Sequence, residues 1–182
     1  MVTIKGITHV AQPACPTPFN SFQISSAHPI IMVNGKSQFN YEVELNILTN
    51  TPQNEVSAIA PWFSFEGPGC FIRGQTAVSV KAQSAIYRCN QPDEKIVPHE
   101  VKIFGFFNVI SVGSQIKGTD PEEVNSCSFT FSLGKGQITP LGMGPGDTVW
   151  ISGVLRKKTC DEVCVDAIFI ASLDELYHAL HI

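Results

Sequence analysis

The stretch GDTVWISGVLRKKTCDEVCVDAIFIASLDELYHALHI, residues Gly146–Ile182, decides the fold of this chain of 182 residues. From Thr148 to Arg156 polar and apolar residues alternate, as they do in a strand with one buried face. The polar segment 156–161 predicts a hairpin loop, and residues 162–173 predict a second, more apolar strand rich in Val and Ile. The first strand carries Val149, Ile151 and Leu155 on one face and Thr148, Trp150, Ser152 and Arg156 on the other.

A glycine and a short helix complete this C-terminal pattern. Gly153 interrupts the first strand and predicts a bulge or a close approach of two backbones. At the end of the second strand, Ser172 or Asp174 can cap a helix. A helix of about ten residues is marginal in water, so we expect it to pack on its own barrel or on another chain. Its apolar stripe, which is the candidate partner-binding surface, consists of Leu173, Leu176, Tyr177 and Leu180.

This order of strand, basic turn, strand and amphipathic helix resembles the end of an oligonucleotide/oligosaccharide-binding (OB) barrel. It is most similar to the middle subunit of replication protein A and its telomere-capping relatives. The resemblance covers about forty residues, and its "G-x-L-R" element is Gly153, Leu155 and Arg156, followed by the lysines of the turn, Val165 to Ile170 and the helix. It implies an OB-like barrel, single-stranded nucleic acid as a ligand, and a terminal helix used for subunit assembly.

Length and composition limit the possible architectures and ligands. A chain of this length can bury one good-sized core or two small β-domains of roughly 80–100 residues each. It is 43% hydrophobic and 15% charged, so it is globular and low in charge, and apolar surface can remain available to a partner. The net charge is −4, and a chain with this charge lacks the broad positive field that drives non-specific binding to phosphate backbones.

The rest of the chain consists of short alternating segments separated by turn residues. This pattern is typical of a sandwich or barrel and predicts a mostly β protein. Pro13, Pro16 and Pro18 predict an irregular N-terminal arm without a core strand. The predicted organisation is an N-terminal arm at 1–36, a β-rich region at 37–95 that is a second β-domain or part of one larger β-sandwich, and an OB-like barrel with a C-terminal helix at 96–182.

Several local predictions can be compared directly with a structure. Asn34-Gly35 predicts a tight hairpin turn, and the strand with the clearest alternation runs from Gln38 to Leu48. Glu66-Gly67-Pro68-Gly69 predicts a turn. His99 to Val112 predicts a strand rich in aromatic residues.

The aromatic residues of this strand and of the strand at 148–156 suggest a stacking surface. Lys102, Phe104 and Phe106 share one face, and Trp150 lies opposite the aliphatic set of its own strand. Together they could form a platform on which bases stack, as OB-folds bind single strands. The alternatives are that Phe104 and Phe106 belong to the core with Phe107 outside, and that Trp150 anchors a protein interface.

The basic cluster Arg156-Lys157-Lys158 is the only concentration of positive charge in the sequence. It is a candidate phosphate contact at the rim of the aromatic surface. The alternative is a solvated hairpin tip, where lysine blunts a sheet edge.

Metal binding finds little support in the sequence. Cys160 and Cys164 form a pair, but structural zinc sites bring a second pair or nearby histidines. His178 and His181 lie at i, i+3 in the terminal helix, which is not sufficient, and a disulfide across the hairpin is a further alternative. We expect reduced thiols, no metal and no cofactor.

Signatures of catalysis are also lacking. The sequence contains no G-x-S-x-G and no recognisable Cys/His arrangement. Glu42 and Glu44 share a strand face roughly 7 Å apart, a distance that would suit a glycosidase-like pair, but nothing in the sequence indicates a cleft around them. The sequence therefore predicts a binding module and not an enzyme.

Targeting features are not visible either. The N-terminus lacks a basic region followed by an apolar one, and no apolar run approaches the ~18 residues of a membrane span. We expect an intracellular protein, nuclear or cytoplasmic, that does not contact a membrane. Two functions stay open: a single-stranded nucleic-acid-binding subunit, or an assembly protein whose apolar faces serve protein contacts or self-association.

Overall fold

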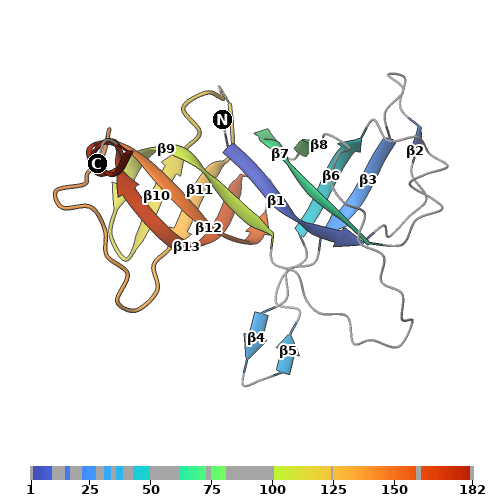
Figure 1. Cartoon of the computed structure of the whole chain (residues 1–182), viewed down its shortest axis with the longest axis horizontal. Helices are drawn as coiled ribbons and strands as arrows, with labels where there is room; N and C mark the ends of the chain where they lie inside the picture. The colour runs from blue at the N-terminus through green and yellow to red at the C-terminus, as the bar shows by residue number, and fades with distance from the viewer. Residues whose placement is uncertain are drawn as a thin grey trace.

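The computed structural model describes residues 2–9, 15–16, 22–27, 31–33, 36–38, 43–49, 62–72, 75–80, 101–123, 125–158 and 161–180. Most of its strands join one sheet of 11 strands, and β4 and β5 form a separate hairpin (Figure 1). The chain is therefore mostly β, as the sequence predicts, and a short helix closes the described part of the chain.

The strands of the first half are β1 (Val2–His9), β2 (Cys15–Pro16), β3 (Phe22–Ala27), β4 (Ile31–Val33), β5 (Lys36–Gln38), β6 (Val43–Thr49), β7 (Trp62–Ile72) and β8 (Gln75–Val80). The second half contains β9 (Lys102–Val112), β10 (Gln115–Thr119), β11 (Ser128–Ser132), β12 (Thr148–Lys158), β13 (Glu162–Ser172) and the helix α2 (Leu173–Leu180).

The second half closes into a five-stranded barrel. Its strands are hydrogen-bonded in the order β10-β11-β13-β12-β9, and a further pairing of β10 with β9 closes the circle. The pair β11–β13 is parallel and the others are antiparallel. If β9 to β13 are numbered 1 to 5 in chain order, neighbouring strands around the barrel follow the order 1-2-3-5-4-1, which is the arrangement of an OB barrel. The predicted OB-like barrel is thus confirmed.

Aromatic rings fill the barrel interior. Phe107 of β9 is 1% exposed, and its ring centroid lies 4.9 Å from that of Phe129 and 4.8 Å from that of Phe131. Burial alternates along β9, so Phe104 and Phe106 point to the opposite face. The alternative in which those two residues are core and Phe107 is outside is therefore wrong.

Gly153 has both of the roles that the sequence predicts for it. The register between β12 and β13 shifts at Ser152/Gly153, which is a β-bulge. A Cβ at Gly153 would collide with the carbonyl oxygen of Asp166 on the neighbouring strand. The glycine thus allows the two backbones to approach closely.

The basic residues belong to a strand and not to a loop, which corrects the prediction of a hairpin loop over 156–161. A second register shift lies between Leu155 and Lys157, and the pairing then resumes with Lys157 opposite Cys164. β12 consequently extends to Lys158. A bulge leaves one residue unpaired while the strand continues beyond it. Alternation of polar and apolar residues in the sequence does not reveal such a bulge.

The first residues of the chain correct the prediction of an irregular arm. β1 lies between β9 and β7 in the large sheet, and the side chains of Val2 and Ile4 are fully buried. The prolines on which that prediction rested begin at residue 13, after β1 has ended. The segment Val2–Lys5 alternates like a half-buried strand.

The first half repeats the strand order of the second. Its strands are neighbours in the order β3-β6-β8-β7-β1, again with a single parallel pair, β6–β8. If the five strands of each half are numbered 1 to 5 in chain order, the large sheet runs 2-3-5-4-1 from β10 to β9 and then 1-4-5-3-2 from β1 to β3. β2 lies at the edge beyond β3. The two first strands, β9 and β1, meet as an antiparallel pair at the centre (Figure 1).

β7 passes straight through residues 66–69, where the sequence predicts a turn. A Cβ on Gly69 would lie 2.5 Å from Cδ1 of Ile4, so the glycine marks close packing against β1. Pro68 is tolerated because the register between β7 and β8 ends at Gly69, which pairs with Val78, so that Pro68 is paired with β1 alone. Farther along, Phe71 reaches the core of the second half, where its ring centroid lies 5.3 Å from that of Phe129.

Other predictions in the first half are confirmed in part. β4 and β5 form an antiparallel hairpin in which Val33 pairs with Lys36, as Asn34-Gly35 predicts. Of the strand expected from Gln38 to Leu48, Gln38 belongs to β5 and residues 43–48 belong to β6, while residues 39–42, including Glu42, lie outside the described residues. The predicted strand at 99–112 corresponds to β9.

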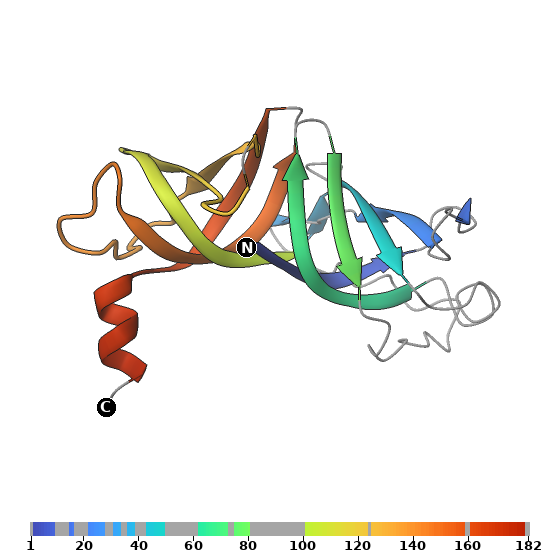
Figure 2. The ribbon, with the colours of Figure 1, turned by 90° about the horizontal axis from the view of Figure 1, so that it is seen from above.

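The helix α2 begins with a reciprocal cap. The hydroxyl of Ser172 accepts a hydrogen bond of 3.1 Å from the Glu175 backbone N–H, and the Glu175 carboxylate accepts one of 2.8 Å from the Ser172 N–H. Of the two predicted caps, Ser172 is the one used. None of the described helix residues is buried, and Figure 2 shows the helix leaving the barrel. Within the described residues, no helix is long and apolar enough to cross a membrane.

Candidate nucleic-acid interface

Three aromatic side chains meet on the outer face of β9 and β12, and we call Phe104, Phe106 and Trp150 the aromatic platform. Trp150 is the cross-strand partner of Phe106, and their ring centroids lie 5.0 Å apart at an interplanar angle of 75°. The centroid of Phe104 lies 5.9 Å from that of Trp150. All three side chains are partly exposed, so the structure brings the predicted aromatic residues together on one accessible face.

The pairing of β9 with β12 determines this geometry. Side chains directly opposite one another on an antiparallel pair project to the same face of the sheet. At one end of the platform, the Thr148 hydroxyl donates a hydrogen bond of 2.8 Å to Oδ1 of Asn108. On the reverse face, Val149 and Ile151 are buried in the barrel. In each strand, the residues that alternate with the aromatic ones are buried in the barrel, and this burial directs the aromatic side chains outward.

Phe169 extends the platform on to β13, and the sequence did not predict it as a site residue. It is the cross-strand partner of Ser152 and is 51% exposed. Strict alternation from Val165 through Ala167 would place Phe169 inside the barrel. Instead, Gly153 pairs with Ala167 and Ser152 with Phe169, so the ladder skips Ile168 and the alternation reverses.

The predicted cations are distributed unequally around the platform. Lys102 is exposed on the same face of β9 as Phe104, and Lys157 is exposed at the far end of β12. The Arg156 side chain is only 15% exposed, and its Nε donates to Oδ2 of Asp166 at 2.6 Å. The positive charge of Arg156 is thus partly neutralised by the Asp166 carboxylate. The side chain of Lys158 lies outside the described part of the chain.

The barrel face formed by β10 and β11 has a different character. OB-folds commonly bind oligonucleotides on the face of their second and third strands, which here are β10 and β11. That face carries Gln115, whose Nε2 donates a hydrogen bond of 3.3 Å to the Ser132 hydroxyl, and the exposed Lys117. None of the described outward residues of these two strands is aromatic. Among the described residues, the exposed and partly exposed aromatic rings of the barrel therefore lie on the platform and on β13, away from the β10–β11 face.

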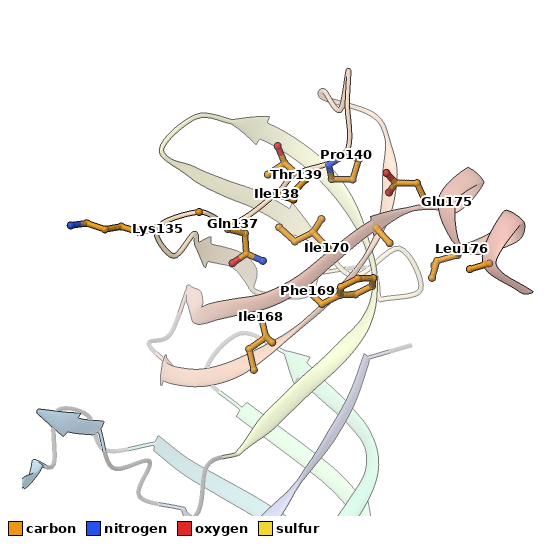
Figure 3. A pocket seen from close by; sticks show the side chains of 13 residues that line it. Lys135, Gln137, Ile138, Thr139, Pro140, Ile168, Phe169, Ile170, Glu175 and Leu176 are labelled. Atoms are coloured by element: carbon orange, nitrogen blue, oxygen red, sulfur yellow. The ribbon is translucent and has the colours of Figure 1, made fainter. Parts of the chain in front are cut away.

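An apolar groove of about 760 Å³ lies between the loop at 135–140, the end of β13 and α2 (Figure 3). Ile168 and Phe169 line it from β13, and Leu176 lines it from the helix. Its one carboxylate, that of Glu175, accepts the capping hydrogen bond from Ser172. The groove offers apolar contact and no pair of carboxylates for acid–base chemistry.

The barrel holds one thiol with a shifted pKa, and the described residues form no cluster of metal ligands. Burial, followed by the charge of Glu162, raises the pKa of the Cys164 thiol above its ordinary value of 9.0. The described residues hold no group of three or more potential metal ligands, and Cys160 and His181, which belonged to the zinc hypothesis, lie outside them. Cys127 is buried, Cys70 and Cys164 are half-buried, and none of these three belongs to a disulfide.

The relationship to known proteins is visible in the fold and not in the sequence. No protein-family model and no curated protein sequence matches the chain. Among solved structures, a deletion mutant of the single-stranded DNA binding protein from Thermus aquaticus is similar with a TM-score of 0.53 and 10% identity, over 94% of each chain. The wild-type protein gives a TM-score of 0.50 and 10% identity, over 94% of this chain and 92% of the other. At this identity the similarity shows the OB fold, and it does not single out the middle subunit of replication protein A.

Proposed function

We propose that this protein is a non-catalytic OB module that binds single-stranded nucleic acid on the aromatic platform. In this proposal, bases stack on Phe104, Phe106 and Trp150, each stacked base contributing about 1–3 kcal/mol. Lys102 and the Arg156–Lys158 segment meet the phosphates. The observation that supports the proposal is the grouping of three partly exposed aromatic rings on β9 and β12.

The charge of the chain determines which interaction dominates binding. With a net charge of −4 and Arg156 held by Asp166, long-range attraction to phosphate is weak. Stacking therefore provides most of the affinity. We expect a shallow dependence on salt, of about 0.7 in log K against log salt for each phosphate contact with a single strand.

The test is fluorescence anisotropy with a labelled single-stranded oligonucleotide and the matching duplex, each at two salt concentrations. The wild-type protein is expected to bind the single strand and to prefer it over the duplex. Trp150→Ala, which removes the central ring, is expected to weaken binding about 5- to 150-fold. Equal affinity of the wild-type and Trp150→Ala proteins would refute the assignment of the platform.

An assembly role for α2 is part of the same proposal. Its stripe is exposed, with Tyr177 at 62% and Leu180 at 80%, which supports docking on a protein partner or a second copy. A protein that only assembles, and binds no nucleic acid, is the competing function. Sedimentation with and without oligonucleotide separates the two functions, because only the assembly protein would form oligomers while remaining indifferent to nucleic acid.

The finer resemblance to the middle subunit of replication protein A and its telomere-capping relatives belongs to this proposal as well. It would place the protein inside the cell, in the nucleus or the cytoplasm, as a non-enzymatic subunit without a cofactor. Localisation of a tagged full-length chain by microscopy tests that placement.

A further inference from the structure

We propose that a bound single strand continues beyond the barrel on to β1, where Lys5 and Lys102 together hold its phosphates. The inference rests on the proposed function, since it extends the path of the same ligand. It adds a site in the first half of the chain, where the sequence predicts no binding residue.

The aromatic platform does not lie at the edge of a sheet. β9 pairs with β12 on one side and with β1 on the other, so the outer face continues across β12-β9-β1-β7. Thr3 of β1 is the cross-strand partner of Phe104 and therefore projects to the same face. A nucleotide stacked on Phe104 thus has β1 directly beside it.

The next pair along these strands consists of two cations. Lys5 and Lys102 are cross-strand partners, and both are exposed. Like charges directly opposite each other on a sheet are destabilising, with side chains about 5 Å apart at Cβ. Within the described part of the chain, neither lysine forms an ion pair. An anion bridging the two ammonium groups would remove this repulsion.

The position of the two lysines fits the backbone of a stacked strand. Lys102 lies two residues from Phe104 on the same face of β9, which corresponds to about 7 Å along a strand. On the far side of β1, the exposed Glu66 is the partner of Lys5. A carboxylate there repels phosphate, so the path ends at β1 and does not extend on to β7.

The experiment compares Lys5→Ala with wild type on oligothymidines of two and twelve nucleotides. A dinucleotide stacked on Phe106 and Trp150 is too short to reach Lys5, so Lys5→Ala is expected to leave its affinity unchanged. For the twelve-nucleotide ligand, loss of one phosphate contact is expected to lower affinity about five- to tenfold at 50 mM salt and to reduce the salt slope by about 0.7. Lys5→Arg is expected to restore binding.

Lys117→Ala is the matched control, because Lys117 is an exposed strand lysine on the β10–β11 face. It is expected to leave both affinities unchanged. Loss of affinity in Lys117→Ala but not in Lys5→Ala would overturn the inference and place the strand on the β10–β11 face. A change of oligomeric state in Lys5→Ala would also overturn it, because the face would then be an interface between copies.

Failure of this inference is distinguishable from failure of the proposed function. If Trp150→Ala weakens both oligonucleotides while Lys5→Ala binds the longer one as wild type does, the platform stands and the path across β1 is wrong. If Trp150→Ala weakens neither, the proposed function itself is wrong.

Discussion

Adjacent phenylalanines on β9 provide a sharp test of the two faces of the barrel. Phe107 is buried among Phe129 and Phe131, so Phe107→Ala leaves a cavity in the core. Truncation of a buried Phe costs about 3–5 kcal/mol of unfolding free energy. For a domain of this size, each kcal/mol corresponds to about 2–4 °C in melting temperature, so Phe107→Ala is expected to melt about 6–20 °C lower.

Phe106→Ala is expected to have the opposite profile. Its ring is partly exposed and makes an edge contact with Trp150, and such a contact contributes about 0.5–1.5 kcal/mol. The melting temperature should therefore fall by only a few degrees. Loss of a stacking surface should weaken binding of a single-stranded oligonucleotide about 5- to 150-fold.

The assays are thermal unfolding followed by circular dichroism and anisotropy titration at a temperature where both variants are folded. Phe107→Ala is expected to bind as wild type does under those conditions. If Phe106→Ala destabilised the fold as strongly as Phe107→Ala, or bound the oligonucleotide with wild-type affinity, the division of β9 into a core face and a binding face would be refuted.

Three further predictions concern the end of the barrel. Gly153→Ala forces β12 away from β13 and is expected to lower the unfolding free energy, measured by urea titration, by about 1–3 kcal/mol. An unchanged unfolding free energy would show that the two backbones are not in close contact. Ser172→Ala removes the cap of α2 and should reduce helical ellipticity, at a cost of about 1 kcal/mol, while Ser172→Asp, which keeps a capping oxygen, should not. Because burial and the charge of Glu162 raise its pKa, Cys164 should be alkylated slowly at pH 8.5, and Glu162→Gln should accelerate the reaction; equal rates would contradict that cause.

The faces of β9 and β12 could be predicted from the sequence because alternation alone determines them. In both strands one buried set of residues specifies the register, so the grouping of Phe104, Phe106 and Trp150 follows once the strands are neighbours. Gly153 was also predictable, since a glycine within a strand usually marks a bulge or a close approach.

Features that depend on long-range packing could not be predicted in the same way. The bulge at Ile168 reverses the alternation of β13 and brings Phe169 to the surface, and nothing in its local sequence signals this reversal. The glycines in β7 suggested a turn because the space beside Gly69 is filled by Ile4, some sixty-five residues earlier in the chain. The pairing of Lys5 with Lys102 likewise exists only because β1 joins β9.

The end of β12 shows how the same limit affects the candidate site. The sequence predicts Arg156 in a loop, as a candidate phosphate contact, but the structure places it in a strand with Asp166 as its partner. A residue ten positions away along a hairpin becomes a neighbour only when the register is known. In the proposed function, phosphate binding therefore shifts toward the lysines, and stacking on the platform provides the larger share of the affinity.

The most direct test of the central claim is the fluorescence of Trp150. The chain contains two tryptophans, Trp62 and Trp150, so Trp62→Phe leaves a single reporter on the platform. Titration of that variant with single-stranded DNA and RNA at low salt is expected to quench its emission saturably as bases stack on the indole. An unchanged spectrum throughout the low-salt titration would contradict the account.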